Sequence, residues 1–168
     1  MGRYRPPLPA KSPYITAAGY ARLELEARDL WVRRRDVVQA LSAAAAEGDR
    51  SENAEYIYRK KQLREMDYRI RYLQKRLPDL KVVDSRPVDP ELVFFGAWIT
   101  LEDETGGECI YRIVGADEFD PAKGWISVDS PVARALLKRR LDEEVAVETP
   151  RGRRRLVITA IRYGAPTG

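Results

Sequence analysis

The sequence contains no histidine and only one cysteine, Cys109, among its 168 residues. A single cysteine rules out a disulfide within the chain and is typical of the reducing cytoplasm, where we expect this protein. Without histidine, and with one thiol, the usual zinc sites and the Ser-His and Cys-His nucleophiles are excluded. Any chemistry that this chain performs must therefore use carboxylates.

Long apolar runs are also missing. No stretch approaches 18 uncharged apolar residues, so we expect neither a transmembrane span nor a membrane partner. The N-terminal sequence MGRYRPPLPAKSPYIT is basic and rich in proline. Because no apolar stretch follows it, we do not expect a secretory signal. We predict a flexible basic arm over residues 1–15.

Charge is present in excess, with a net value of +4, but it is unevenly distributed. Residues 1–81 contain 18 Lys and Arg against 11 Asp and Glu, whereas residues 82–168 contain 12 against 15. This asymmetry indicates two modules, the first of which binds an anionic partner.

The first module shows two heptad-like seams. The first seam comprises Leu23, Ala27, Leu30, Arg34, Val37, Leu41 and Ala44, and the second comprises Tyr56, Arg59, Leu63, Met66, Ile70, Leu73 and Leu77. The two seams mirror each other about residue 50, as expected for two antiparallel helices with interlocking side chains. We therefore predict a helical hairpin, the prong, over residues 16–79, with Thr16 as N-cap. At 1.5 Å per residue its ~30-residue first helix is roughly 45 Å long.

The second module has the period of strands. Pro78 and the RPVDP sequence predict a linker over residues 80–90. Strand-like segments then occupy 93–101, 108–114, 125–128, 145–149 and 154–163, and a short helix follows Ser130 and Pro131. We predict an α+β protein: an antiparallel coiled-coil hairpin followed, over residues 91–164, by a small antiparallel sheet domain with one helix.

The turn between the two predicted helices, GDRSENAEY, is acidic in an otherwise basic module. One interpretation is structural: Gly48 ends the first helix, Asp49 or Ser51 caps the second, and Asp49 with Glu52 has the spacing of a capping box. The other interpretation is chemical. Carboxylates are ligands of Mg²⁺, which commonly takes one or two protein carboxylates plus substrate phosphate. Two carboxylates at the end of a prong would complete a metal site that a partner has half built.

Behind this tip, the second predicted helix is strongly basic. Its segment YRKKQLREMDYRIRYLQKR carries eight Lys and Arg against two acids, with interleaved tyrosines, and the first helix adds Arg33, Arg34 and Arg35. A solvated helix face is one interpretation. The excess of one sign favours nucleic acid, because basic side chains neutralise phosphates and tyrosines stack on bases. For Arg34 and Arg59, which fall on the seams, we expect packed stems with outward-turned heads.

Four motifs, in order and at the same spacing, resemble the bacterial Gre transcript-cleavage factors. They are GDRSENAEY at the tip, VFFGAW (93–98), YRIVGADE (111–118) and ISVDSPVARALLKR (126–139). The resemblance spans residues 16–163, and the DRSENA form of the tip is more similar to the GreB branch than to the GreA branch. It implies an N-terminal coiled coil and a C-terminal FKBP-like domain.

The resemblance also implies a function. Gre factors insert their coiled coil into the secondary channel of RNA polymerase and stimulate Mg²⁺-dependent endonucleolytic cleavage of backtracked nascent RNA, which rescues arrested complexes. By similarity, Asp49 and Glu52 would be the catalytic carboxylates, sharing Mg²⁺ with the polymerase. Ser51 and Glu55 are candidates for a supporting role, and a purely capping role stays open for Glu55. The free protein is not expected to hold the ion, and it is not expected to be an enzyme, because the catalytic centre belongs to the polymerase.

The same resemblance assigns two contact surfaces. The residues expected to face the nascent RNA 3′ end are Arg33, Arg34, Arg59, Lys60, Lys61 and Arg64. Asp129, Ser130 and Pro131 would dock on bacterial RNA polymerase, and we expect a monomer. Two alternatives stay open: a secondary-channel regulator that does not promote cleavage, and a coiled-coil RNA-binding protein that needs no polymerase.

Overall fold

The structure is a computed structural model that describes residues 6–48, 53–84 and 86–164. The elements are, in chain order, β1 (Tyr14–Ile15), α1 (Ala17–Ala46), α2 (Ala54–Asp79), β2 (Lys81–Val82), β3 (Trp98–Asp103), β4 (Glu108–Val114), η1 (Ala116–Glu118), η2 (Pro121–Lys123), β5 (Trp125–Ser127), α3 (Pro131–Leu136), β6 (Glu144–Thr149) and β7 (Gly152–Arg162). They form two compact units. The helical unit comprises Tyr20–Leu80, and the sheet unit comprises Met1–Gly19 with Lys81–Gly168.

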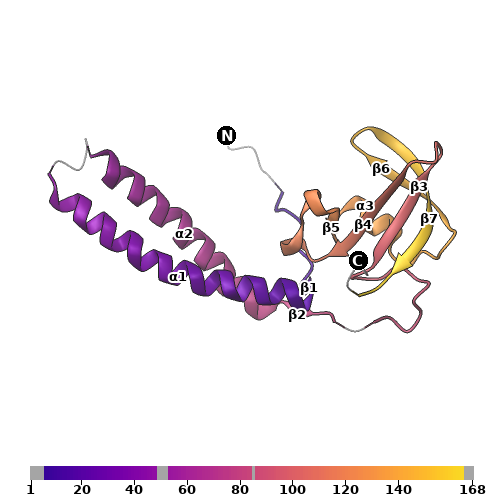
Figure 1. The fold of residues 1–168 in the computed structure, drawn as a ribbon, viewed down its shortest axis with the longest axis horizontal. Coiled ribbons are helices and arrows are strands. Elements are labelled where there is room, and N and C mark those ends of the chain that lie inside the picture. Colours follow the sequence, from indigo (N-terminus) through magenta and orange to yellow (C-terminus); the bar gives the residue numbers. More distant parts are fainter. Residues whose placement is uncertain (1–5, 49–52, 85, 165–168) are drawn as a thin grey trace. The chain divides into compact units, whose positions relative to one another are not determined.

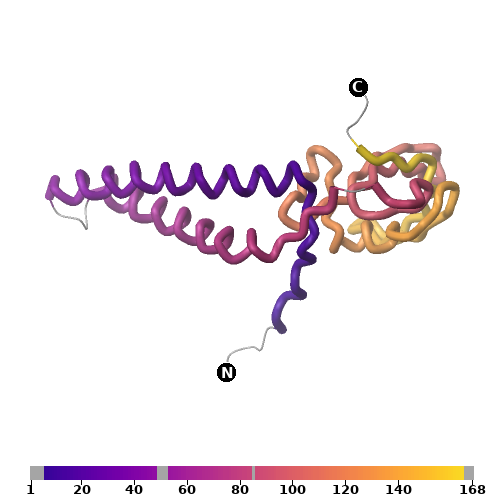
Figure 2. The backbone as a smooth tube through the Cα atoms, turned by 90° about the horizontal axis from the view of Figure 1, so that it is seen from below, coloured from indigo at the N-terminus to yellow at the C-terminus, as the bar shows by residue number. Residues whose placement is uncertain are grey.

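The helical unit is the predicted antiparallel hairpin of α1 and α2 (Figures 1 and 2). The side chains buried between the two helices are Leu23, Leu30, Val37, Ala44, Met66, Ile70 and Leu73, all of them from the predicted seams. Polar contacts confirm the direction of the chains. The Arg34 guanidinium lies 2.6 Å from the Asp67 carboxylate, and Arg69 lies 2.6 Å from Glu26. Because each helix packs on a single partner, most of its surface is exposed.

Residues 12–15 require a correction to the predicted flexible arm. Ile15 is completely buried, and β1 pairs in parallel with β2. The N–H groups of Lys81 and Val83 donate to the carbonyls of Pro13 and Ile15, both at 2.8 Å. These backbone bonds and the burial of one apolar side chain order the end of the arm, so the chain enters and leaves the helical unit through one small sheet.

The sheet unit contains a five-stranded sheet in the order β5-β4-β3-β7-β6 (Figure 1). Its core includes Ile99, Leu101, Ile113, Ile158 and, from α3, the fully buried Leu136. The predicted sheet domain with one helix is confirmed, but the sheet is mixed, because β5 runs parallel to β4. The connection through η1 and η2 turns the chain so that β5 runs beside the last three residues of β4, Arg112–Val114, in the same direction, which a tight hairpin turn could not do.

A buried carboxylate fixes the first turn of α1 in the sheet unit. Thr16 Oγ1 accepts a hydrogen bond of 3.0 Å from the Gly19 N–H, which confirms the predicted N-cap. Glu118 is only 4% exposed, and it accepts hydrogen bonds from the Thr16 hydroxyl, from the Thr16 N–H at 3.0 Å and from the Gly115 N–H at 2.8 Å. A Cβ at Gly19 would overlap this carboxylate. Glycine at position 19 thus gives Glu118 its place beside the helix N-terminus.

Candidate functional site

The tip of the helical unit is closed by Asn53, a residue to which the sequence analysis gave no role. Its side-chain oxygen accepts a hydrogen bond of 3.1 Å from the Tyr56 N–H, so Asn53 is the N-cap of α2. Its side-chain nitrogen donates to the Ala44 carbonyl at 2.7 Å, which ties the start of α2 to the end of α1. The signal was present in the sequence, since Asn is a strong N-cap residue directly before a helix-forming run.

This cap corrects one of the two interpretations of the tip. Asp49 and Ser51 were candidates for the N-cap of the second helix, but Asn53 takes that position, and α2 begins only at Ala54. Gly48 has a φ of +133°, a conformation that favours glycine and agrees with its predicted place after the first helix. Asp49, Ser51 and Glu52 lie outside the described residues. The prediction of Asp49 or Ser51 as the N-cap of the second helix is therefore wrong.

Replacing Asn53 should separate its two contributions. Asn53→Ala removes the cap and the contact with Ala44, and we expect the free energy of unfolding to fall by about 1–2 kcal/mol. Asn53→Ser keeps a capping oxygen and loses the donated bond, so it should cost roughly half as much. Thermal unfolding followed by circular dichroism measures both. An alanine variant as stable as the parent chain would contradict this role.

Glu55 is the carboxylate of the tip region that the structure describes. It lies in the first turn of α2, where a negative charge suits the helix dipole. Its Oε1 accepts a 2.8 Å hydrogen bond from Arg59 Nε, one turn further along the helix. Glu55 therefore has a partner on its own helix.

The residues predicted to face RNA fall into two groups. Arg33, Lys60, Lys61 and Arg64 are exposed. Arg34 is about one-third exposed and paired with Asp67, whose hydrogen bond and charge raise the pKa of this guanidinium above its ordinary value. Arg59 is held by Glu55 and by Gln62, at 3.1 Å. The exposed group can contact a phosphate directly, although Lys61 also lies 4.0 Å from Glu65 in a weak, exposed pair. Arg34 and Arg59, in contrast, bind acceptors at short distance within the hairpin.

The helix faces also carry exposed aromatic rings. Tyr58 and Tyr68 are 58% and 71% exposed, and Tyr68 lies about one turn from both Arg64 and Arg71. A groove of 480 Å³ lies beside the seam, with Leu30 and Met66 among its lining residues. Cations and rings thus alternate on the surface of α2, as the sequence indicated.

The predicted docking residues begin α3 in the sheet unit. Ser130 is the N-cap of α3, with its Oγ accepting a 3.2 Å hydrogen bond from the Ala133 N–H, and Pro131 occupies the first helical turn. The Asp129 carboxylate accepts from the N–H of Ser12 at 2.8 Å and from the Ser12 hydroxyl. The N-terminal segment therefore contacts the predicted docking loop. No local sequence pattern predicts this contact.

Metal ligands do not assemble on the described part of the chain. No group of three or more Asp, Glu or Cys side chains there could hold a metal ion. The donor chemistry at the tip is nevertheless that of Mg²⁺, since Asp49 and Glu52 supply carboxylate oxygens. None of the described helices combines the length and the apolar character that a membrane crossing requires.

Comparison with known proteins decides the family. The family model described as "Transcription elongation factor, N-terminal" matches residues 13–82, and "Transcription elongation factor, GreA/GreB, C-term" matches residues 88–163. The chain belongs to the GreA/GreB family of transcription elongation factors. This confirms the resemblance on which the sequence analysis relied.

Curated members of the GreA/GreB family are similar over nearly the whole chain. The transcription elongation factor GreB of Xanthomonas axonopodis pv. citri is 57% identical over 167 residues, which cover 98% of this chain and 99% of the relative. GreB of Pseudomonas aeruginosa is 58% identical over 164 residues, covering 97% and 98%. Among solved structures, the elongation factor GreA/GreB from Nitrosomonas europaea is 21% identical with a TM-score of 0.42, covering 90% of this chain and 100% of that one.

Proposed function

We propose that this chain binds bacterial RNA polymerase through its secondary channel and stimulates Mg²⁺-dependent endonucleolytic cleavage of backtracked nascent RNA, thereby rescuing arrested complexes. The observation that carries the proposal is the pair Asp49 and Glu52 at the tip of a confirmed helical hairpin, in a chain of the GreA/GreB family. Asn53 is the N-cap of α2, so the N-cap role that the sequence analysis offered to Asp49 does not fall to it.

In the proposed mechanism, Asp49 and Glu52 bind Mg²⁺ together with the polymerase. When bound, Mg²⁺ would supply a water of lowered pKa and a positive charge to offset the charge that develops on the phosphodiester. The role of Asp49 and Glu52 would be to hold and orient this ion from the side of the hairpin tip. Water then attacks the phosphorus and the bond to the 3′ oxygen breaks, so the retained RNA regains a 3′ hydroxyl. The chain donates ligands, and the catalytic centre remains that of the polymerase.

The shaft of the hairpin would hold the extruded RNA. Arg33, Lys60, Lys61 and Arg64 are the exposed cations available for its phosphates. Arg34 and Arg59 would contribute less directly, because Arg34 is paired with Asp67 across the two helices and Arg59 is paired with Glu55 within α2. The partner in this proposal is the 3′ end of nascent RNA in a backtracked complex, and the factor acts as a monomer.

Docking on the polymerase is proposed at Asp129, Ser130 and Pro131. Pro131 is exposed, while Asp129 and Ser130 are half-buried and fixed by the hydrogen bonds to Ser12 and Ala133. A rigid loop of this kind presents its polar groups without a large ordering cost on binding. The Ser12 contact makes the end of the N-terminal arm part of the same surface.

A cleavage assay on a backtracked complex tests the proposed function. Polymerase carrying end-labelled RNA is mixed with the protein in Mg²⁺ without nucleotides, and the RNA length is followed over time. We expect shortening of the RNA that is much faster than with polymerase alone. Binding to polymerase without faster shortening would favour a channel regulator that does not promote cleavage, and RNA binding without polymerase affinity would favour an independent RNA-binding protein.

A further inference from the structure

The β6–β7 hairpin carries a concentration of arginine that the proposed function does not use. Four arginines, Arg151, Arg153, Arg154 and Arg155, lie within five consecutive positions of the sequence TPRGRRR. All four are exposed. The region from residue 82 onwards otherwise has more acidic than basic residues, so this cluster opposes the charge of its surroundings.

Strand register separates this segment from the rest of the sheet. The last pair between β3 and β7 joins Asp103 to Leu156, whereas the pairs between β6 and β7 continue to Thr149 and Gly152. Residues 152–155 therefore have β6 on one side and no strand partner on the other within the described chain. We call residues 146–155 the basic ribbon, a two-stranded extension with four arginines and one carboxylate, Glu148.

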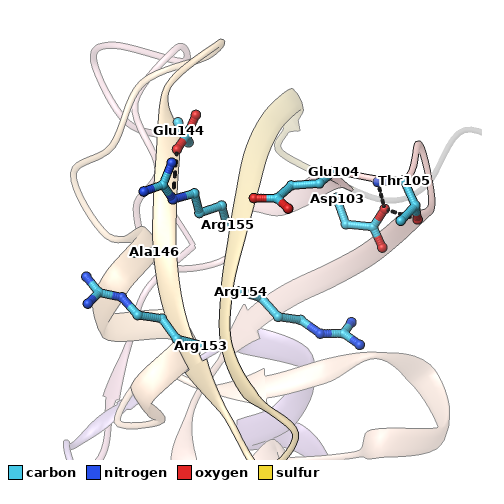
Figure 3. A pocket seen from close by; sticks show the side chains of 8 residues that line it. All are labelled: Asp103, Glu104, Thr105, Glu144, Ala146, Arg153, Arg154 and Arg155. Atoms are coloured by element: carbon cyan, nitrogen blue, oxygen red, sulfur yellow. Dashed lines mark hydrogen bonds and ion pairs between the residues drawn. The ribbon is translucent and has the colours of Figure 1, made fainter.

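The arginines of the basic ribbon point to both of its faces. Successive side chains of a strand alternate, and Figure 3 shows Arg153 and Arg155 extending to one side of β7 and Arg154 to the other. A hollow of 710 Å³ lies beside them, bounded on its far side by Asp103, Glu104 and Thr105. The basic ribbon therefore carries guanidinium groups on both of its faces.

Neighbouring carboxylates leave these arginines largely available. Arg153 is 4.0 Å from Glu148, and Arg155 is 3.7 Å from Glu144, with all four side chains more than half exposed. Exposed pairs of this kind are weak and exchange readily with other anions. Among the described residues, Arg151 and Arg154 form no ion pair within 4.0 Å. Asp103 is engaged mainly in its own turn, where hydrogen bonds from Thr105 and Gly107 lower the pKa of its carboxyl, and the charge of Arg154 makes a smaller contribution.

We propose that the basic ribbon is a second nucleic-acid site, which binds the phosphodiester backbone independently of the acidic tip. Arginine matches phosphate geometry with two parallel hydrogen bonds. A two-stranded ribbon fits the width of a duplex groove, so arginines on both faces reach phosphates on either side of it. Duplex DNA and single-stranded RNA share this backbone chemistry, and the experiment distinguishes them by using one probe of each kind.

The test measures binding of a short labelled DNA duplex, and separately of a single-stranded RNA, to the full chain by fluorescence anisotropy across a range of salt concentrations. The ribbon variant is Arg151→Gln/Arg153→Gln/Arg154→Gln. The matched control, Lys81→Gln/Lys138→Gln/Arg162→Gln, removes the same charge from exposed positions elsewhere in the sheet unit. Both are made in a chain that also carries Lys60→Gln, Lys61→Gln and Arg64→Gln, so that shaft binding does not mask the result.

We expect the ribbon variant to bind about tenfold more weakly at low salt, with a slope of log affinity against log salt that is shallower by about two to three, since each lost phosphate contact removes about 0.9. If the ribbon variant loses more affinity for the DNA duplex than for the RNA, duplex DNA is the ligand. If it loses the same affinity for both probes, the ribbon binds the phosphodiester backbone of DNA and RNA alike. A triple Lys replacement at the three ribbon positions should retain most of the slope, because it keeps the three positive charges.

Two results would overturn the proposal. An equal loss in the matched control would show that net charge alone controls binding. Unchanged nucleic-acid affinity of the ribbon variant would show that the basic ribbon is not a nucleic-acid site. The anisotropy measurement contains no polymerase, so its outcome is separate from that of the cleavage assay.

Discussion

Replacing the two tip carboxylates should abolish stimulated RNA cleavage while leaving the fold and polymerase binding intact. Asp49→Asn/Glu52→Gln keeps the size of both side chains but removes the negative charges that bind Mg²⁺. We expect the rate of transcript shortening to fall by about 100-fold or more, because a metal ligand contributes more than the residues that merely orient it. The measurement is the cleavage time course on a backtracked complex, with polymerase binding measured in parallel.

Glu55→Gln provides the matched control for this experiment. It removes one carboxylate from the same end of the hairpin, but that carboxylate is bonded to Arg59 within α2. Because an exposed pair of this kind contributes at most about 1 kcal/mol, both stability and cleavage should change little. If the double variant cleaved as fast as the parent chain, the tip would not supply a metal ligand. If Glu55→Gln lost as much activity as the double variant, the total negative charge at the tip would control RNA cleavage, and no specific ligand pair would be needed.

Glu118→Ala should cause the largest loss of stability among single substitutions of the polar residues discussed. The carboxylate accepts three hydrogen bonds, and its removal leaves the buried N–H groups of Thr16 and Gly115 without this acceptor. Leaving such donors unsatisfied costs about 1–3 kcal/mol each, so we expect the free energy of unfolding to fall by about 3 kcal/mol. Denaturant unfolding measures the change.

A matched substitution is Glu108→Ala, which removes an exposed carboxylate from β4 and should alter stability by less than about 0.5 kcal/mol. Gly19→Ala approaches the same buried site from the helix, because the added Cβ overlaps Glu118 and must displace it. We therefore expect Gly19→Ala to be destabilising despite the better helix propensity of alanine. A stable Glu118→Ala chain would show that the N-cap hydroxyl of Thr16 anchors α1 unaided.

The helical hairpin was predictable because each helix must bury one apolar stripe along its whole length. Leu30 and Ile70, like the other seam residues, recur at helical spacing since only one stripe of each helix can be buried. The cap was missed for the opposite reason. Asp49 and Glu52 have the spacing of a capping box, and this local pattern led to a predicted N-cap before the true one. The N-cap is Asn53, whose side chain accepts the hydrogen bond from the Tyr56 N–H three residues later.

Contacts between distant polar residues were beyond the reach of sequence patterns. Ser12 and Asp129 are 117 positions apart, and neither belongs to a periodic series that would bring them together. Glu118 is similar: from sequence it belongs to an acidic, turn-like stretch, and only the folded chain shows it buried against Thr16. The roles of Asp49, Glu52 and Ser51 came from resemblance and stay predictions, since these residues lie outside the described chain.

The parallel pairing of β1 with β2 makes the helical unit an insertion within another domain. The strands that precede and follow it are neighbours, with Tyr14 opposite Lys81 and Ile15 opposite Val82, so its two ends lie about one strand spacing, roughly 4.8 Å, apart. A hairpin that folds locally brings these ends together before the pairing forms, which avoids most of the entropic cost of closing so long a loop. The hairpin could consequently be exchanged for another one with the same spacing between its ends, and the flanking strands would still pair.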